Sequence, residues 1–310
     1  MTTGDVIVIG GANIDIKAKA EGELIAGTSN PGVVTFAPGG VARNIAHNLA
    51  RLDISVALIS AIGTDAFGND LLRQTEAAGV DCSMVLRTRG QMSSYVAILD
   101  ARGELAVAVN AMPAMDLLTP EVLALHEKRL AAARLILADC NLPQQSLAWL
   151  ARFAAKLVIE PVSVTKAEKT RALHGGGIFA IACNRQQAEH LCKVKIGTIG
   201  DAFGAATKLH EQGFERVLIT LGPDGAVASQ KDKDSAHVEP FANLARDVTG
   251  GGDAAAAGLI FGLIEGFDVV AAARLGQAAA SLAVADMNSV SSELTRARLL
   301  SLASSRRNGR

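Results

Sequence analysis

The sequence predicts an α/β fold in which a mainly parallel central sheet lies between two layers of helices. Two observations carry this prediction: short runs of Val, Ile and Leu alternate with Ala-rich segments, and the apolar residues of those segments recur at spacings of three and four. This alternation is typical of crossover units on a parallel sheet. With 310 residues, 49% hydrophobic and 20% charged, the chain can bury a large core, and its composition excludes disorder.

The apolar runs predict seven core strands and five helices in chain order. The strands are expected at residues 5–9, 55–60, 134–138, 156–159, 178–182, 216–220 and 225–229. The helices are expected at residues 42–52, 67–78, 145–153, 199–212 and 254–266.

Two stretches, about 14–36 and 92–108, break this rhythm, and the second has the pattern of a hairpin. We expect them to form one small β-sheet lid over an edge of the body, although a simple extension of the main sheet would give the same pattern. We therefore predict one domain over residues 1–303, with the lid segments inserted, and a polar tail over 304–310.

Charge and composition exclude several classes of protein. The formal net charge of −1 gives no reason to expect a nucleic acid as partner. No apolar run is long enough to span a membrane, and the first residues lack the basic region of a signal peptide. The four cysteines show no paired or zinc-site spacing, so we expect reduced thiols and a cytoplasmic protein.

The clearest motif is a run of three glycines followed by an acid and an Ala-rich helix, Asp247-Val248-Thr249-Gly250-Gly251-Gly252-Asp253. Glycines allow a tight turn, and the free N–H groups of a following helix can surround an anion. The alternative is a plain helix cap in which Asp253 only stabilises the helix start. Because the common nucleotide-phosphate loops are absent, we expect any phosphate to bind here.

A second constellation follows the first strand. Asn13 and Asp15 stand at alternate positions, so in an extended segment both side chains face the same way and suit two neighbouring hydroxyl groups. Gly39 and Gly40 permit close backbone approach, and Asn44 follows on the first turn of a helix. The pattern indicates a diol site; turn glycines with a local Asn or Asp turn are the open alternative.

Together these motifs resemble the ribokinase-like, or phosphofructokinase-B-type, carbohydrate and nucleoside kinases over nearly the whole chain. The shared motifs are Gly10-Gly11 with Asn13 and Asp15, Pro38-Gly39-Gly40 with Asn44, Thr220-Leu221-Gly222-Pro223-Asp224-Gly225, and Thr249 to Asp253. More specific blocks resemble the pseudouridine kinases within this family. They are Ser29-Asn30-Pro31-Gly32, residues 38–46, Ser93-Ser94-Tyr95, Ala138-Asp139-Cys140-Asn141, and Pro161-Val162-Ser163 with Lys166.

The resemblance implies a three-layer, Rossmann-like sandwich whose β-sheet lid often forms a dimer clasp. It implies transfer of the ATP γ-phosphoryl group to the 5′-hydroxyl of pseudouridine, with Mg²⁺ and K⁺ as cofactors. A ribokinase or another nucleoside or sugar kinase is the alternative within the family. A catalytically weak nucleoside-binding regulator is the alternative outside enzymes, and a dinucleotide oxidoreductase lacks its glycine fingerprint.

The same resemblance assigns roles to individual residues. Asp253 would be the base, and the amides of Gly250, Gly251 and Gly252 would form the anion hole. The substrate would contact Asn13, Asp15, Ser29, Asn30, Gly39, Gly40, Asn44, Asn141 and Lys166, although a surface polar residue is the more common alternative for Lys166. ATP would contact Asn184, Thr220, Gly222, Gly225 and Gln277, and K⁺ would bind at Asp247 and Thr249.

One position departs from the family pattern. The family has Asn-x-x-Glu near the metal and phosphates, whereas this chain reads Asn184-Arg185-Gln186-Gln187. A neutral amide cannot hold a magnesium–water shell as a carboxylate does, so we expect altered metal affinity or phosphate activation. Glu160 also stands where an aspartate is common, and Gly251 replaces a more common alanine.

Overall fold

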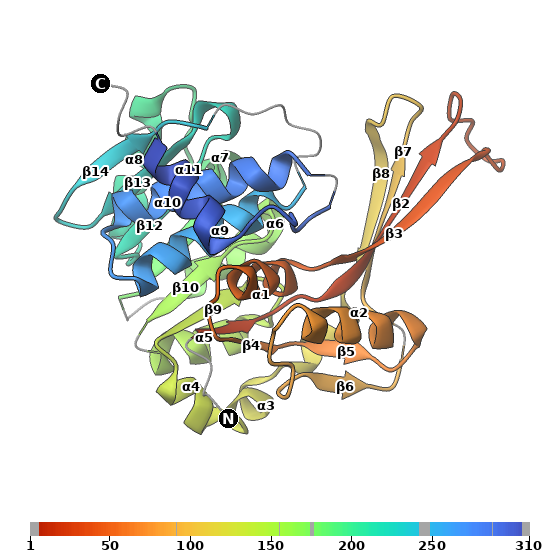
Figure 1. The fold of residues 1–310 in the computed structure, drawn as a ribbon, viewed down its shortest axis with the longest axis horizontal. Coiled ribbons are helices and arrows are strands. Elements are labelled where there is room, and N and C mark those ends of the chain that lie inside the picture. Colours follow the sequence, from red (N-terminus) through yellow and green to blue (C-terminus); the bar gives the residue numbers. More distant parts are fainter. Residues whose placement is uncertain are drawn as a thin grey trace.

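The computed structural model describes residues 6–90, 92–154, 156–173, 177–241, 249–286 and 288–305. An eight-stranded sheet runs through its centre in the order β14-β13-β12-β11-β10-β9-β1-β4 (Figure 1). The strands from β12 to β4 are parallel, and β13 and β14 are antiparallel at one edge. Their bounds are β1 Val6–Ile9, β4 Val56–Ile59, β9 Leu135–Asp139, β10 Leu157–Glu160, β11 Ala180–Asn184, β12 Arg216–Thr220, β13 Ala226–Gln230 and β14 Ser235–Val238.

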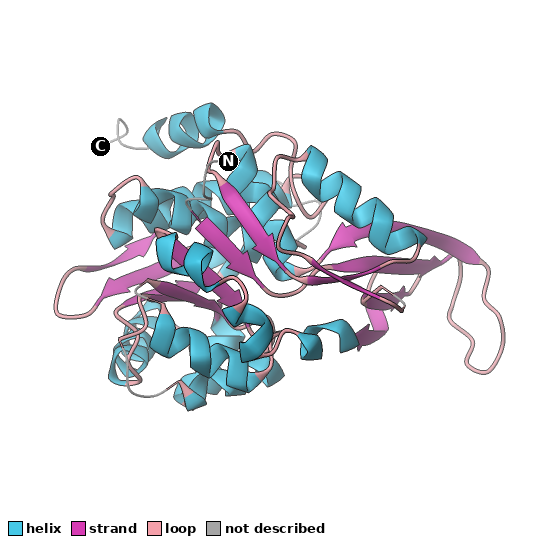
Figure 2. Cartoon of the chain, turned by 90° about the horizontal axis from the view of Figure 1, so that it is seen from below, coloured by secondary structure: helices cyan, strands magenta, loops and turns pink. Residues whose placement is uncertain are grey.

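Helices cover both faces of this sheet, as Figure 2 shows. One layer contains α1 (Val41–Arg51), α9 (Gly251–Ile264), α10 (Val269–Val284) and α11 (Arg296–Ser305). The other contains α3 (Pro120–Ala124), α4 (Glu127–Ala132), α5 (Gln144–Phe153), α6 (Val164–Ala167), α7 (Arg185–Cys192) and α8 (Ile199–Glu211). Both faces of the sheet are covered because both faces are apolar. In strand β1, Val6 and Val8 pack against the first layer, whereas Ile7 and Ile9 pack against the second.

A second sheet projects from the body in the order β3-β2-β7-β8 and is called the lid sheet below (Figure 1). Its strands are β2 Asn13–Ala20, β3 Gly32–Gly39, β7 Ser94–Leu99 and β8 Leu105–Ala111. They contain most of the two stretches that broke the sequence rhythm. Beside its base lie α2 (Ala66–Ala77) and a short pair, β5 (Ala61–Gly63) and β6 (Leu86–Thr88), and the ring of Phe36 stacks on Phe67 of α2 with centroids 5.3 Å apart. The predicted fold class, including the separate small sheet, is confirmed.

Several details differ from the prediction. The strand expected at 178–182 runs over Ala180–Asn184, so Asn184 ends a strand and begins a helix. Strand β14 and helices α7, α10 and α11 were not predicted, and Ser304 and Ser305 lie in α11 rather than in a polar tail. Within the described residues, no helix is long and apolar enough to cross a membrane.

Candidate active site

The carboxyl ends of β1, β9 and β10 meet the first turn of α1, and Asp139 joins these segments. Its Oδ2 accepts hydrogen bonds from the Gly11 N–H (2.8 Å) and the Ala42 N–H (3.1 Å), and its Oδ1 accepts from the Asn141 N–H (2.9 Å). Asp139 is fully buried, and burial raises its pKa while these N–H groups oppose that shift. Because both oxygens accept from N–H donors, the backbone selects the ionised carboxylate.

The predicted diol pair lies on β2 with its side chains together. Asn13 Nδ2 donates to Asp15 Oδ1 at 2.7 Å, as expected for alternate positions on a strand. A Cβ on Gly39 would lie 2.5 Å from the Asp15 carboxyl, and one on Gly40, whose φ is 97°, would lie 2.4 Å from the Gly11 carbonyl oxygen. Both glycines are therefore required for the close approach that the sequence indicated.

Asp253 lies in the first turn of α9, directly opposite α1. Asn44 Nδ2 donates to Asp253 Oδ2 at 2.8 Å, which joins residues 209 positions apart in the chain. Burial raises the pKa of Asp253 to about 7; the Asn44 hydrogen bond opposes this shift, and the carboxylates of Asp139 and Asp15 add to it. A carboxyl group with a pKa near neutrality is suited to accept a proton at physiological pH.

The three glycines before Asp253 form the turn into α9. Gly250 is left-handed with a φ of 80°, and a Cβ there would lie 2.1 Å from the Ser289 carbonyl oxygen. A Cβ on Gly252 would meet nothing within 4 Å, so the space beside this amide is open. The first-turn N–H groups of a helix have no partner within the helix, which leaves those of Gly251 and Gly252 available to an anion.

Asn141 and Lys166 lie beside the diol pair. Lys166 Nζ donates to Asn141 Oδ1, and a Cβ on Gly11 would lie 2.5 Å from Asn141 Nδ2. Lys166 is half-buried, and its amine is held by the Asn141 side chain. Desolvation lowers the pKa of its amine, and the nearby Asp139 carboxylate opposes that shift.

Ser29 and Asn30 lie in the loop at the far end of β2 and β3, away from the body (Figure 1). Asn30 Oδ1 accepts from the Ile25 N–H at 2.8 Å, and its Nδ2 donates to the carbonyls of Ile25 (3.0 Å) and Thr28 (3.2 Å). Its polar atoms therefore stabilise their own loop. A single chain does not bring these two residues to Asp253.

The predicted ATP residues gather at neighbouring strand ends. Asn184 of β11 is in register with Thr220 of β12, and Gly222 and Gly225 follow with φ values of 64° and 83°. Gln277 lies apart from these ends, buried on α10. For the cation site, Thr249 Oγ1 accepts from Lys17 Nζ at 3.5 Å, whereas Asp247 lies outside the described residues.

Gln187, the departure from the family pattern, completes a capping box at the start of α7. Its Oε1 accepts from the Asn184 N–H at 2.8 Å, and its own N–H donates to Asn184 Oδ1 at 2.9 Å. Gln187 is only 2% exposed. The Gln187 oxygen is used in this box and the other end of the amide is an NH₂ donor, so this side chain cannot serve as an anionic magnesium ligand.

Sequence reasoning gave no site role to two acids here, the buried Asp139 and the half-buried Glu160. Asp139 lies next to the predicted Asn141, but no local pattern shows that it binds three backbone segments. Glu160 is paired in register with Asp139 and accepts from the Val162 N–H at 2.7 Å. Burial, with the Asp253 and Asp139 carboxylates, raises the pKa of Glu160 well above its usual range. The backbone after Glu160 is constrained, because Val162 has a φ of 68°. This conformation is visible in the structure but not in the sequence.

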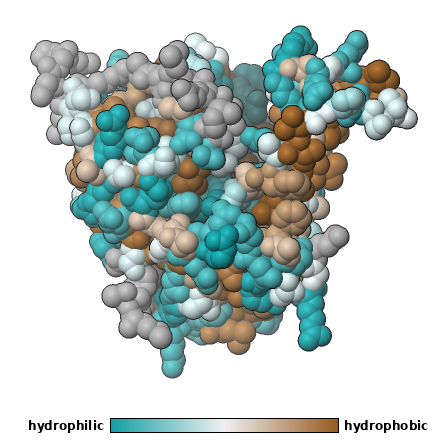
Figure 3. Space-filling view, turned by 45° about the vertical axis from the view of Figure 1, so that its right-hand side comes forward, coloured by the Kyte–Doolittle hydropathy of each residue, from teal (hydrophilic) through white to brown (hydrophobic). Residues whose placement is uncertain are grey.

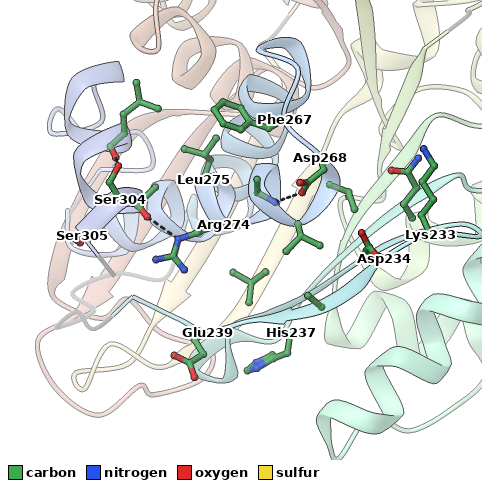
Figure 4. Close-up of a pocket in the computed structure, with 18 residues that line it drawn as sticks. Lys233, Asp234, His237, Glu239, Phe267, Asp268, Arg274, Leu275, Ser304 and Ser305 are labelled. Carbon is green, nitrogen blue, oxygen red and sulfur yellow. Dashed lines mark hydrogen bonds between the residues drawn. The ribbon is translucent and has the colours of Figure 1, made fainter. Parts of the chain in front are cut away.

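A cavity lies elsewhere, lined by residues of β14, α10 and α11 (Figure 4). It encloses about 1290 Å³, and Arg274, His237 and Asp268 are among its lining residues. None of the predicted site residues lines it. Most of the predicted site residues lie instead around the strand ends and Asp253, whose half-buried carboxyl accepts from Asn44 beside the glycine turn.

Comparison with known proteins shows the family of this chain. The model of the pfkB family of carbohydrate kinases matches residues 3–296. The chain is 36% identical over 300 residues to the pseudouridine kinase of Escherichia coli K12, and the alignment covers 96% of each protein. It is 30% identical over 266 residues to the ribokinase of Haemophilus influenzae, and that alignment covers 84% of this chain and 85% of the ribokinase.

Among solved structures, a carbohydrate kinase from Agrobacterium tumefaciens superposes with a TM-score of 0.83 at 30% identity, covering 96% of both chains. The family model spans most of this chain, and the alignment with the E. coli relative covers 96% of it. The observed fold agrees with these similarities. This chain therefore belongs to the pfkB family of carbohydrate kinases and is an ATP-dependent kinase with a ribokinase-like α/β fold.

Proposed function

We propose that this kinase transfers the γ-phosphoryl group of ATP to the 5′-hydroxyl of pseudouridine, giving pseudouridine 5′-phosphate and ADP. The observation that carries the chemistry is the half-buried Asp253 carboxyl, which accepts a hydrogen bond from Asn44 beside the glycine turn. The similarity to the E. coli pseudouridine kinase supports the substrate class. The alternative acceptor is ribose or another nucleoside, because a diol site does not read the base.

In the proposed reaction, Asp253 accepts the proton of the 5′-hydroxyl as the oxygen forms a bond to the γ-phosphorus. The bond from this phosphorus to the bridging oxygen breaks, and ADP leaves with the electron pair. The N–H groups of Gly250, Gly251 and Gly252 stabilise the charge on the transferred group. A positioned base of this kind contributes about 10²- to 10⁴-fold to the rate.

Substrate recognition is assigned to the polar pair and its neighbours. Asp15 and Asn13 bind the ribose 2′- and 3′-hydroxyls, and Gly39 and Gly40 allow the backbone to pack closely against Asp15 and Gly11. Pseudouridine carries an additional ring N–H, because its base is linked through carbon. The Asn141–Lys166 pair lies beside the sugar site and supplies polar groups for the base.

The proposal includes ATP with Mg²⁺, and K⁺ at Asp247 and Thr249. Magnesium bound to ATP supplies positive charge to the phosphates. The position of the family's acidic ligand is occupied by Gln187, a neutral amide whose oxygen takes part in the capping box. Cys82, Cys140, Cys183 and Cys192 are buried free thiols, which supports the assignment to a reducing cytoplasm.

We also propose that the lid sheet pairs with a second copy of the chain. Hydrophobic surface gathers on the projecting part of the molecule in Figure 3. The edge strands carry six apolar side chains that are each 54–62% exposed: Val33, Val34 and Phe36 of β3 and Leu105, Val107 and Val109 of β8. Light scattering should give a dimer for the parent and a monomer for a variant with both Val107→Lys and Val109→Lys.

The function is tested by ADP release with ATP, Mg²⁺ and K⁺ against pseudouridine, uridine, adenosine, inosine, ribose and fructose. We expect selective turnover of pseudouridine, lost in Asp253→Asn while the fold remains intact. Preference for ribose or another acceptor would keep the kinase and overturn the substrate assignment. Pseudouridine binding without turnover in the parent protein would favour a regulator, for which the neutral Gln187 is the motivating observation.

A further inference from the structure

Arg43 is a buried cation behind the candidate base. It lies on α1 and is 3% exposed. Its guanidinium donates to three uncharged acceptors: Asn44 Oδ1 (2.7 Å), the Pro38 carbonyl (3.3 Å) and His47 Nδ1 (3.0 Å). In the part of the chain that the structure describes, no carboxylate forms an ion pair with it. Burying a charge without an ion pair is costly, so its retention requires a reason beyond stability.

The hydrogen-bond directions along this chain of residues are fixed by chemistry. A guanidinium can only donate, so Asn44 must turn its oxygen toward Arg43 and its NH₂ group toward Asp253. His47 Nδ1 must likewise be the unprotonated nitrogen. Burial, with the charges of Arg43 and Arg51, lowers the pKa of His47 to about 4, so the ring is neutral at pH 7.

Reversing the Asn44 amide would place NH₂ against the guanidinium and oxygen against the Asp253 carboxylate. Both contacts would then be repulsive. The orientation of the group that touches Asp253 is therefore determined by Arg43, one residue earlier in the chain, and the contact does not depend on Asn44 alone.

The charges around Asp253 give Arg43 a second effect. The carboxylates of Asp139 on β9 and Asp15 on β2 disfavour the ionised base, whereas Arg43 on α1 favours it; Glu160 on β10 is itself shifted upward by Asp253. Asp15 responds to Arg43 in the same direction, and the pKa of Arg43 falls to about 10 through burial, with Asp15, Asp253 and Cys82 opposing that fall. Arg43 remains charged at neutral pH.

We propose that Arg43 is a positioning residue for the base: it fixes the amide of Asn44 that donates to Asp253, and it supplies the positive charge facing the Asp15 and Asp253 carboxylates. The inference rests on the proposed role of Asp253 in phosphoryl transfer. It predicts an effect on proton acceptance that a purely structural arginine would not have.

The test compares pH–rate profiles of Arg43→Met and Arg43→Lys with that of the parent. In Arg43→Met, which lacks the charge, the acid limb of the pH–rate profile should shift to higher pH by about 1 unit. Because Asp253 titrates at about 7, this shift gives about a fivefold loss at pH 7 that disappears near pH 9. Arg43→Lys keeps the charge and should leave the acid limb of the pH–rate profile unchanged. The control Arg51→Met should also leave it unchanged, because the Arg51 guanidinium donates to carbonyls of the 292–294 segment.

A direct readout is the ¹³C NMR titration of the Asp253 carboxyl, which needs no turnover. Its midpoint should rise in Arg43→Met and stay unchanged in Arg43→Lys. Arg43→Gln, which keeps a donor for Asn44 and removes the charge, gives the same test if the Met variant fails to fold. A folded, uncharged variant with an unmoved midpoint would overturn the inference. Full turnover by Asp253→Asn would instead overturn the proposed function.

Discussion

Replacing Asp139 with Asn removes one acceptor oxygen from the point where β1, α1 and β9 meet. The carboxylate now accepts from the N–H groups of Gly11, Ala42 and Asn141 at 2.8, 3.1 and 2.9 Å. The single oxygen of an amide can face only one side of this arrangement. On the other side an NH₂ group would meet a backbone N–H donor, and that donor would stay buried without an acceptor.

The cost follows from these contacts. Loss of one hydrogen bond to a charged group is worth about 1.5–3 kcal/mol, and a buried unsatisfied donor costs about 1–3 kcal/mol. We therefore expect Asp139→Asn to lower the free energy of unfolding by roughly 3 kcal/mol. For a chain of this size that corresponds to a fall in melting temperature of about 6–10 °C.

Thermal and urea denaturation at pH 7 measure this loss. Asp70→Asn is the matched control, because Asp70 is 47% exposed in its pair with Arg73, and its replacement should change stability by less than about 0.5 kcal/mol. An Asp139→Asn variant that melts with the parent would refute the reasoning that an ionised carboxylate joins these segments.

Three other measurements test the site. Turnover should fall about tenfold from pH 8 to pH 6, because burial raises the pKa of Asp253 to about 7 and only the ionised base accepts a proton; a flat rate profile would exclude Asp253 as the base. Gly250→Ala should lower the melting temperature by roughly 4–8 °C, because its Cβ would lie 2.1 Å from the Ser289 carbonyl oxygen. Gly252→Ala should melt like the parent, because a Cβ there meets open space; equal melting temperatures of the two variants would contradict this reasoning. Gln187→Glu should fold normally, because Glu completes the same capping box, and should reach half-maximal turnover at lower Mg²⁺; an unchanged requirement would show that no acid is needed there.

The features that sequence predicted are local ones. The alternation of strands and helices follows from burial on both faces of the sheet, and the shared face of Asn13 and Asp15 follows from the two-residue period of a strand. The glycine turn before Asp253 was also visible, because only glycine tolerates the φ of 80° at Gly250.

The features that sequence missed depend on distant partners or on weak local signals. Asp139 is defined by N–H groups of Gly11 and Ala42, about one hundred or more residues away. Strand β14 is short and largely exposed, so it lacks the apolar run that marks a buried strand. Gln187 could be recognised as different from the family pattern, but its capping role required the position of the Asn184 backbone.

The strand that begins with Asn13 and Asp15 continues without a break to Ala20, well out in the lid sheet. The residues proposed to hold the sugar and the outer part of the lid are therefore one mechanical piece. Under the proposed roles, a chimaera that receives the β2–β3 hairpin of a relative also receives that relative's sugar-binding residues. An exchange of this hairpin would then change the proposed contact between two copies and the substrate preference together.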